Sequence, residues 1–88
     1  MRYIQNPAIH AKKIKDTWYL LGKDKSVLHE LNEVASIIWE SLVEYQTVND
    51  LTKTICKKYE VSERVAKKDI ESFLDKYDRD KYILKIKN

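Results

Sequence analysis

The sequence contains few of the residues from which catalytic and metal sites are usually built. Among 88 residues it has one cysteine, one glycine, one proline and two histidines. The single cysteine, Cys56, cannot form an internal disulfide, which agrees with a reducing compartment. The single glycine, Gly22, leaves no glycine-rich phosphate loop. His10, His29 and Cys56 are widely separated and show no metal-ligand spacing, so we expect no cofactor, no metal site and no enzyme activity.

Long hydrophobic runs are also missing. No apolar stretch approaches the roughly 20 residues that a membrane-spanning helix needs, and residues 1–7 lack the apolar region of a signal peptide. The chain has 43% hydrophobic and 35% charged residues, which is typical of an ordinary folded domain. It shows no repeat, low-complexity stretch or linker, so we expect residues 1–88 to form a single cytoplasmic domain with no membrane partner.

The net charge of +3 is concentrated at the two ends of the chain. Residues 1–25 have six basic and two acidic residues, residues 26–80 have eight and twelve, and residues 81–88 add three lysines. A DNA-reading helix would come from the acidic middle, where phosphate repulsion opposes it. The third predicted helix has four basic and four acidic residues between Glu63 and Tyr77, and so no net charge. A winged-helix nucleic-acid-binding regulator therefore stays as the alternative function.

Three helices are predicted, each beginning at a capping residue. The expected N-caps are Asn32, Thr47 and Ser62, and Asp50 forms a capping pair with Thr47. The first helix is expected to run from about Glu33 to Val43, and the third to about Tyr77. Apolar residues recur at helical spacing and predict a shared core. The candidate core residues are Ile38, Leu42, Leu51, Ile55, Tyr59, Ala66, Ile70, Phe73, Leu74 and Tyr77.

Strands are predicted on both sides of the helices. The expected strands are Ile9 to Ile14, Thr17 to Leu21, Val27 to Leu31 and, at the end, Lys81 to Ile86 with Tyr82, Leu84 and Ile86 on one side. Turns are expected at Lys15-Asp16 and from Gly22 to Ser26. The predicted fold is α+β and winged helix-turn-helix-like. A small antiparallel N-terminal sheet of two or three strands precedes three helices and a short terminal strand.

The third strand forms a sheet edge whose use the periodicity leaves open. An edge has unpaired amides and carbonyls, and it is a liability unless it is short, charged, covered or used. The strand from Val27 to Leu31 is short and carries Glu30, which suits a protected edge. One flank of the third helix mixes Val65 with polar residues, so edge and flank together could instead accept an extended peptide. The other interpretation is that the helix flank is exposed to solvent, that the strand edge is protected against pairing, and that neither binds a peptide.

Several short motifs resemble the PqqD-like family in order and spacing. The front half is carried by Trp18-Tyr19-Leu20-Leu21, a turn, the strand that starts at Val27, and Asn32-Glu33-x-Ala35-x-x-Ile38-Trp39. The back half is carried by Thr47-Val48-x-Asp50-Leu51, Tyr59 and Asp69-Ile70-x-x-Phe73-Leu74. The resemblance covers roughly residues 9–84, nearly the whole chain.

This family is the RiPP recognition element, a small winged-helix-like domain that binds the leader segment of a ribosomally made precursor peptide. It delivers that peptide to a modifying enzyme, often a radical-SAM enzyme, or to the leader peptidase of a lasso-peptide pathway. The resemblance implies a non-catalytic peptide chaperone of natural product biosynthesis, without a nucleic-acid partner. It also implies that the leader adds as a strand along the third strand, against the third helix. Carried over by position, the peptide-binding residues are Val27, Leu28, His29, Glu30, Val65, Lys68, Asp69, Ser72 and Lys76.

Overall fold

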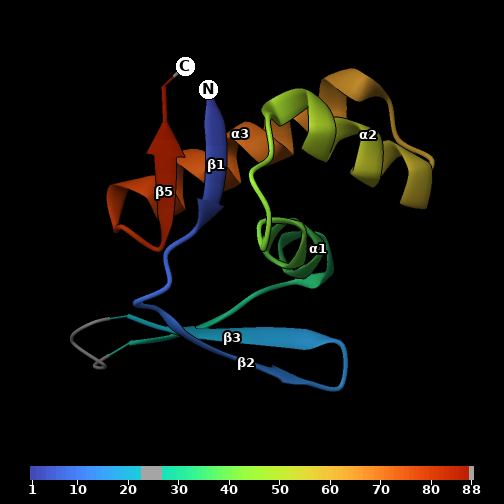
Figure 1. The fold of residues 1–88 in the computed structure, drawn as a ribbon. Helices are drawn as coiled ribbons and strands as arrows, with labels where there is room; N and C mark the ends of the chain where they lie inside the picture. Colours follow the sequence, from blue (N-terminus) through green and yellow to red (C-terminus); the bar gives the residue numbers. More distant parts are fainter. Residues whose placement is uncertain (23–26, 88) are drawn as a thin grey trace.

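The computed structural model describes residues 1–22 and 27–87 (Figure 1). In chain order the elements are β1 (Arg2–Gln5), β2 (His10–Ile14), β3 (Thr17–Leu21), β4 (Leu28–Glu30), α1 (Glu33–Ser41), α2 (Val48–Lys58), α3 (Glu63–Arg79) and β5 (Ile83–Ile86). The predicted α+β class is confirmed, and the layout of strands and helices fits a winged helix-turn-helix arrangement. None of the described helices is long and apolar enough to cross a membrane.

The strands form two small antiparallel sheets in the described part of the chain. One has the order β2-β3-β4, which confirms the predicted meander, although β4 is shorter than expected by one residue at each end. The other pairs β1 with β5, and the sequence did not suggest β1. The turn expected at Lys15-Asp16 is present, and Lys15 has a positive φ of 57°. The turn expected from Gly22 to Ser26 lies mostly outside the described residues.

Each helix begins at its predicted cap. The Asn32 side chain accepts from the amide of Ala35 at 2.8 Å, which satisfies one free donor of the first turn of α1. Thr47 and Asp50 form a reciprocal capping box at the start of α2, so the shorter aspartate closes the box as glutamate usually does. The Ser62 side chain accepts from the third residue of α3 at 3.2 Å. Helix α1 ends at Ser41 rather than at the expected Val43, because the chain turns there.

Helix α3 extends to Arg79, two residues beyond the expected end, and finishes without glycine. The amide of Lys81 donates to the Asp78 carbonyl at 3.1 Å, and the amide of Tyr82 donates to the Tyr77 carbonyl at 2.9 Å. These two bonds define a Schellman motif, in which the left-handed position falls on Lys81 with φ 63°. The rings of Tyr77 and Tyr82 lie 5.5 Å apart and supply the apolar contact that accompanies this motif.

This turn also changes which residues of β5 face the core. The expected alternation, with Tyr82, Leu84 and Ile86 on one side, is wrong: Ile83 is fully buried, whereas Leu84 is 39% exposed. Tyr82 is buried as well, because it precedes the strand and belongs to the Schellman turn. The side-chain alternation therefore starts only at Ile83, which pairs with Gln5 of β1.

The core lies where α1, α2 and α3 meet the two sheets. Nine of the ten predicted core residues are buried, and they are joined by Leu20, Leu31, Trp39, Tyr82 and Ile83. Tyr59 is only half-buried, because it stands at the end of α2 and its hydroxyl donates to the exposed Glu33 carboxylate at 2.6 Å. Figure 1 shows α1 between the β2–β3 hairpin and the pair α2 and α3, with β1 and β5 side by side against α3. Helix α1 thus holds the meander, with its edge strand β4, beside α3. This placement creates the site described next.

Candidate functional site

Strand β4 forms an open edge of the three-stranded sheet. In the part of the chain that the structure describes, β3 occupies one side of β4 and no strand pairs with the other. Its residues pair in the register Tyr19 with Glu30, Leu20 with His29 and Leu21 with Leu28. An unpaired edge presents backbone donors and acceptors to which an extended chain can add.

One hydrogen bond fixes the direction of the β4 backbone groups. The amide of Leu31 donates to the carbonyl of Trp18 at 2.9 Å, one step beyond the paired residues. In an antiparallel pair, hydrogen-bonded and non-hydrogen-bonded positions alternate. His29 and Leu31 therefore direct their backbone groups toward β3, whereas Leu28 and Glu30 direct theirs outward. The open edge thus offers the N–H and C=O groups of Leu28 and Glu30.

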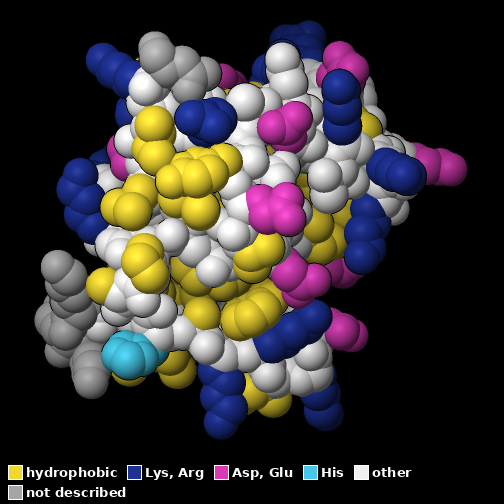
Figure 2. Space-filling view, in the orientation of Figure 1, with side chains coloured by type: hydrophobic (Ala, Val, Ile, Leu, Met, Phe, Trp, Pro, Cys, Tyr) yellow, Lys and Arg dark blue, Asp and Glu magenta, His cyan; other side chains and the backbone are white. Residues whose placement is uncertain are grey.

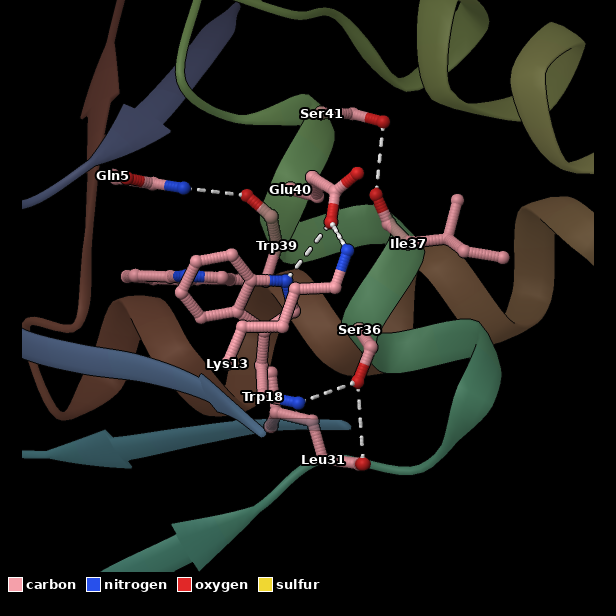
Figure 3. A network of polar contacts seen from close by, with 9 residues as sticks. All are labelled: Gln5, Lys13, Trp18, Leu31, Ser36, Ile37, Trp39, Glu40 and Ser41. Carbon is pink, nitrogen blue, oxygen red and sulfur yellow. Dashed lines mark hydrogen bonds and ion pairs between the residues drawn. The ribbon is translucent and has the colours of Figure 1, made fainter. Parts of the chain in front are cut away.

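A polar network holds this edge against α1 (Figure 3). The Ser36 hydroxyl accepts from the Trp18 amide at 3.2 Å and donates to the Leu31 carbonyl at 3.3 Å, so it bridges β3 and the end of β4. Glu40 accepts from Trp18 Nε1 at 3.0 Å and from Lys13 Nζ at 2.9 Å. These two hydrogen bonds hold the pKa of the Glu40 carboxyl below its usual range. The network joins β2, β3 and α1, and so sets the position of β4.

A groove of about 430 Å³ lies between the end of β4, α1 and α3. Its floor is apolar, and the flank of α3 gives it a polar wall. The lining residues are Glu30, Leu31, Asn32, Val34, Ala35, Ile38, Asp69, Ser72, Phe73, Lys76 and Tyr77. The combination of an apolar floor, a few polar side chains and a free strand edge is typical of surfaces that bind extended peptides.

The structure brings four of the nine predicted site residues to this groove: Glu30, Asp69, Ser72 and Lys76. Leu28 is 62% exposed on β4, and Val27, just before the strand, is 52% exposed. These two residues and the remaining three lie outside the groove lining. The His29 ring turns to the aromatic cluster, and Val65 and Lys68 are exposed on α3.

Sequence reasoning missed most of the groove floor. Phe73 and Tyr77 were predicted only as core residues, and Val34 and Ala35 were not named as site residues, although all four line the groove. Val34 and Ala35 remain half-buried, as expected for residues that cover a core and face an opening. One sequence signal could have indicated Val34 and Ala35 as site residues, which is their position on the first turn of α1, directly after the edge strand. They form part of the groove floor only because α1 and α3 lie on either side of the groove.

An aromatic cluster supports the groove from behind. The His29 ring lies 5.7 Å from the Tyr77 ring and 5.0 Å from the Tyr82 ring, edge to face in both cases. Burial, with smaller contributions from Tyr82 and Asp80, raises the pKa of the Tyr77 phenol. The hydroxyl of Tyr77 therefore stays protonated and neutral at physiological pH. These contacts fix the distance between the middle of β4 and the second half of α3.

The surface over β1 is less suited to strand addition than the edge of β4. Hydrophobic side chains also gather over β1 and β5 (Figure 2), around a hollow lined by Ile4, Gln5, Pro7, Val43, Tyr45 and Leu84. The outer edge of β1 is already occupied there, because Tyr3 and Gln46 exchange backbone hydrogen bonds of 2.8 and 2.9 Å.

The described residues contain no group of three His, Cys, Asp or Glu side chains arranged to hold a metal ion. Cys56 is half-buried beside the core.

The fold and the groove define a small α+β domain whose free strand edge lies beside a helix. The sequence model of the family described as "Coenzyme PQQ synthesis protein D (PqqD)" matches residues 17–83. The chain therefore belongs to the PqqD family, and the resemblance drawn from its motifs is confirmed.

Two solved structures have the same fold over nearly their whole length. "TbiB1 in Complex with the TbiA(beta) Leader Peptide" has a TM-score of 0.84 and 22% identity, covering 97% of this chain and 99% of that one. "Lasso peptide synthetase B1 complexed with the leader peptide" has a TM-score of 0.80 and 20% identity, covering 94% and 98%. A comparison with curated protein sequences gave no significant match.

Proposed function

We propose that this chain recognises the leader segment of a ribosomally made precursor peptide by adding it as a strand to β4. Two proteins of the same fold were solved in complex with a leader peptide, and the chain belongs to the PqqD family. The observation that carries the proposal is the outward direction of the Leu28 and Glu30 backbone groups beside the groove.

In this role residues 1–88 act as one non-catalytic domain. The domain binds the leader and presents the rest of the precursor to a modifying enzyme, such as a radical-SAM enzyme, or to a leader peptidase, in the cytoplasm. Strand addition suits the task, because backbone bonds supply much of the affinity while the groove selects side chains. The nine residues named from the sequence stay the proposed contact set, with the floor residues Val34, Ala35, Phe73 and Tyr77 added.

The alternative function, nucleic-acid binding, finds no support in the charge of α3. Helix α3 has five basic and five acidic residues between Glu63 and Arg79. A helix that enters the major groove gains affinity from an excess of positive charge, which α3 does not provide.

A pair of tryptophan substitutions tests the proposal. Ser72 and Glu71 are neighbouring exposed residues of α3, but only Ser72 lines the groove. Binding of the leader segment of a precursor encoded beside this chain is measured by calorimetry, together with the melting temperature. Ser72→Trp is expected to fill the groove and weaken binding by roughly tenfold or more, whereas Glu71→Trp leaves it unchanged.

Two results would contradict the proposal. The first is equal binding of the leader by the wild type and by Ser72→Trp, which would place the site elsewhere. The second is tight binding of a defined DNA duplex at physiological salt without any binding of the leader. Weak duplex binding that disappears as salt rises agrees with the proposal, because it reflects only counterion release.

A further inference from the structure

Two opposite charges stand along the α3 wall of the groove. Asp69 and Lys76 both line it, and both side chains are exposed. They are seven residues apart, so they lie on nearly the same side of the helix and about 10 Å apart along its axis. Ser72 lies between them. The wall therefore has one negative and one positive end.

Neither charge has an ionic partner in the described residues. The ion pairs found there join Lys13 to Glu40 and Lys85 to Asp78. The Lys76 ammonium lies 5.3 Å from the centre of the Tyr77 ring, an arrangement that favours a position along the groove. Both charges are thus available to a ligand.

The geometry also shows which end of the groove each charge occupies. Tyr77, next to Lys76, lies against His29 in the middle of β4. The groove lining includes Asn32 and other residues at the start of α1, but it does not include Leu28. The groove thus extends from Lys76 toward the start of α1, with Asp69 at that far end. Glu30 lines it from β4 and adds to the negative charge.

We infer that the strand bound here has a basic residue two or four positions before an acidic one, with the basic side chain facing Asp69 and Glu30 and the acidic one facing Lys76. This inference rests on the proposed function. An extended chain advances about 3.3 Å per residue, so about 10 Å corresponds to roughly three residues. Successive side chains of a strand point to opposite faces, so two residues that face the same wall are separated by an even number of positions. The spacing is therefore two or four. The order of the two residues follows if the added strand is antiparallel to β4, which is the more stable pairing and the one that β3 already makes with β4. Such a strand runs against β4 and meets Asp69 before Lys76.

The probe that tests this is a random library of displayed peptides about twelve residues long, which is enough for one strand. The library is selected on the wild type, on Lys76→Glu and on Asp69→Lys. The wild type is expected to enrich basic residues two or four positions before acidic ones. Lys76→Glu should replace the preference for an acidic residue by one for a basic residue. Asp69→Lys should replace the preference for a basic residue by one for an acidic residue. Each reversal should weaken wild-type-selected peptides by roughly fivefold or more.

Lys67→Glu and Asp75→Lys are the matched controls, because both side chains are exposed on α3 and neither lines the groove. Both controls should keep the wild-type preference. If Ser72→Trp weakens the selected peptides but they show no charge pattern, or if the pattern survives both reversals, the inference is wrong and the proposed function stands. If the library yields no peptide that Ser72→Trp weakens, both are wrong.

Discussion

The backbone amide of Leu31 donates to the carbonyl of Trp18 at 2.9 Å, and this contact determines which β4 groups face solvent. By alternation, the amide of His29 points to β3 and the amide of Leu28 points outward. Proline lacks an amide hydrogen and is tolerated in a strand only where that hydrogen makes no internal bond. The two neighbouring positions therefore respond differently to proline.

We predict that Leu28→Pro costs less than about 0.5 kcal/mol of folding stability and weakens leader binding by about 1 kcal/mol, the value of one lost hydrogen bond. His29→Pro should instead destabilise the fold by more than about 1 kcal/mol, since it removes an internal bond. Denaturant titration and peptide calorimetry measure both effects. His29→Ala is the control, because it removes the ring contacts with Tyr77 and Tyr82 but keeps the amide. Equal stability of the two proline variants would mean that the assigned alternation is wrong.

Phe73 belongs both to the core and to the groove floor, and it is 8% exposed. We predict that Phe73→Ala costs about 3–5 kcal/mol, because it removes a large buried ring and leaves a cavity. For a domain of this size that is most of its stability. Phe73→Leu, which keeps most of the volume, should cost clearly less. A melting temperature of Phe73→Ala within a few degrees of the wild type would show that this side chain is not a core residue.

The features predicted best from the sequence are local ones. Asn32, Thr47 and Ser62 cap their helices as expected, because a cap depends on only three or four neighbouring residues. The stripe of α3 from Ala66 to Tyr77 is buried as expected, since one amphipathic helix keeps its period over its whole length.

The features missed depend on contacts distant in sequence. Strand β1 has only four residues, and its partner β5 stands at the other end of the chain, so no local pattern indicates the pair. The Schellman turn at Lys81 lacks the glycine that usually signals it, and Leu84 was therefore placed on the wrong face. On the α3 wall, Asp69 lines the groove whereas its neighbour Lys68 does not, and this difference depends on where α1 and β4 lie relative to α3.

The turn at Lys81 gives a prediction of increased stability. A left-handed conformation costs a non-glycine residue roughly 1–2 kcal/mol, and the greater freedom of glycine in the unfolded chain offsets part of the gain. Lys81→Gly should therefore raise the free energy of unfolding by about 0.5 kcal/mol, as measured by denaturant titration. Lys67→Gly, at an exposed position inside α3, should instead lower the free energy of unfolding by about 1 kcal/mol. A loss of stability in Lys81→Gly would contradict the assigned conformation.

Glu40 gives a prediction about pH. Its pKa is lowered by the hydrogen bonds from Trp18 and Lys13, so the charged form stabilises the folded state. This stabilisation is fully present above the unfolded pKa of about 4.3, and it is lost as pH falls through the lower folded value. Glu40→Gln should reduce stability at neutral pH by less than about 1 kcal/mol, because the carboxylate is partly screened by solvent. The difference between the two proteins should shrink as the pH falls below about 4.3, as measured by urea titration. A constant difference across this range would mean that the charge of Glu40 does not matter.

The measurement that tests strand addition most directly is residue-specific amide hydrogen exchange of the protein with and without saturating leader peptide. The outward amides of Leu28 and Glu30 should exchange readily in the free protein and slow by roughly tenfold or more when the peptide is bound. The inward amides of His29 and Leu31 should be protected in both states and serve as internal controls. If bound leader leaves the exchange rates of Leu28 and Glu30 unchanged, the peptide does not add as a strand to β4.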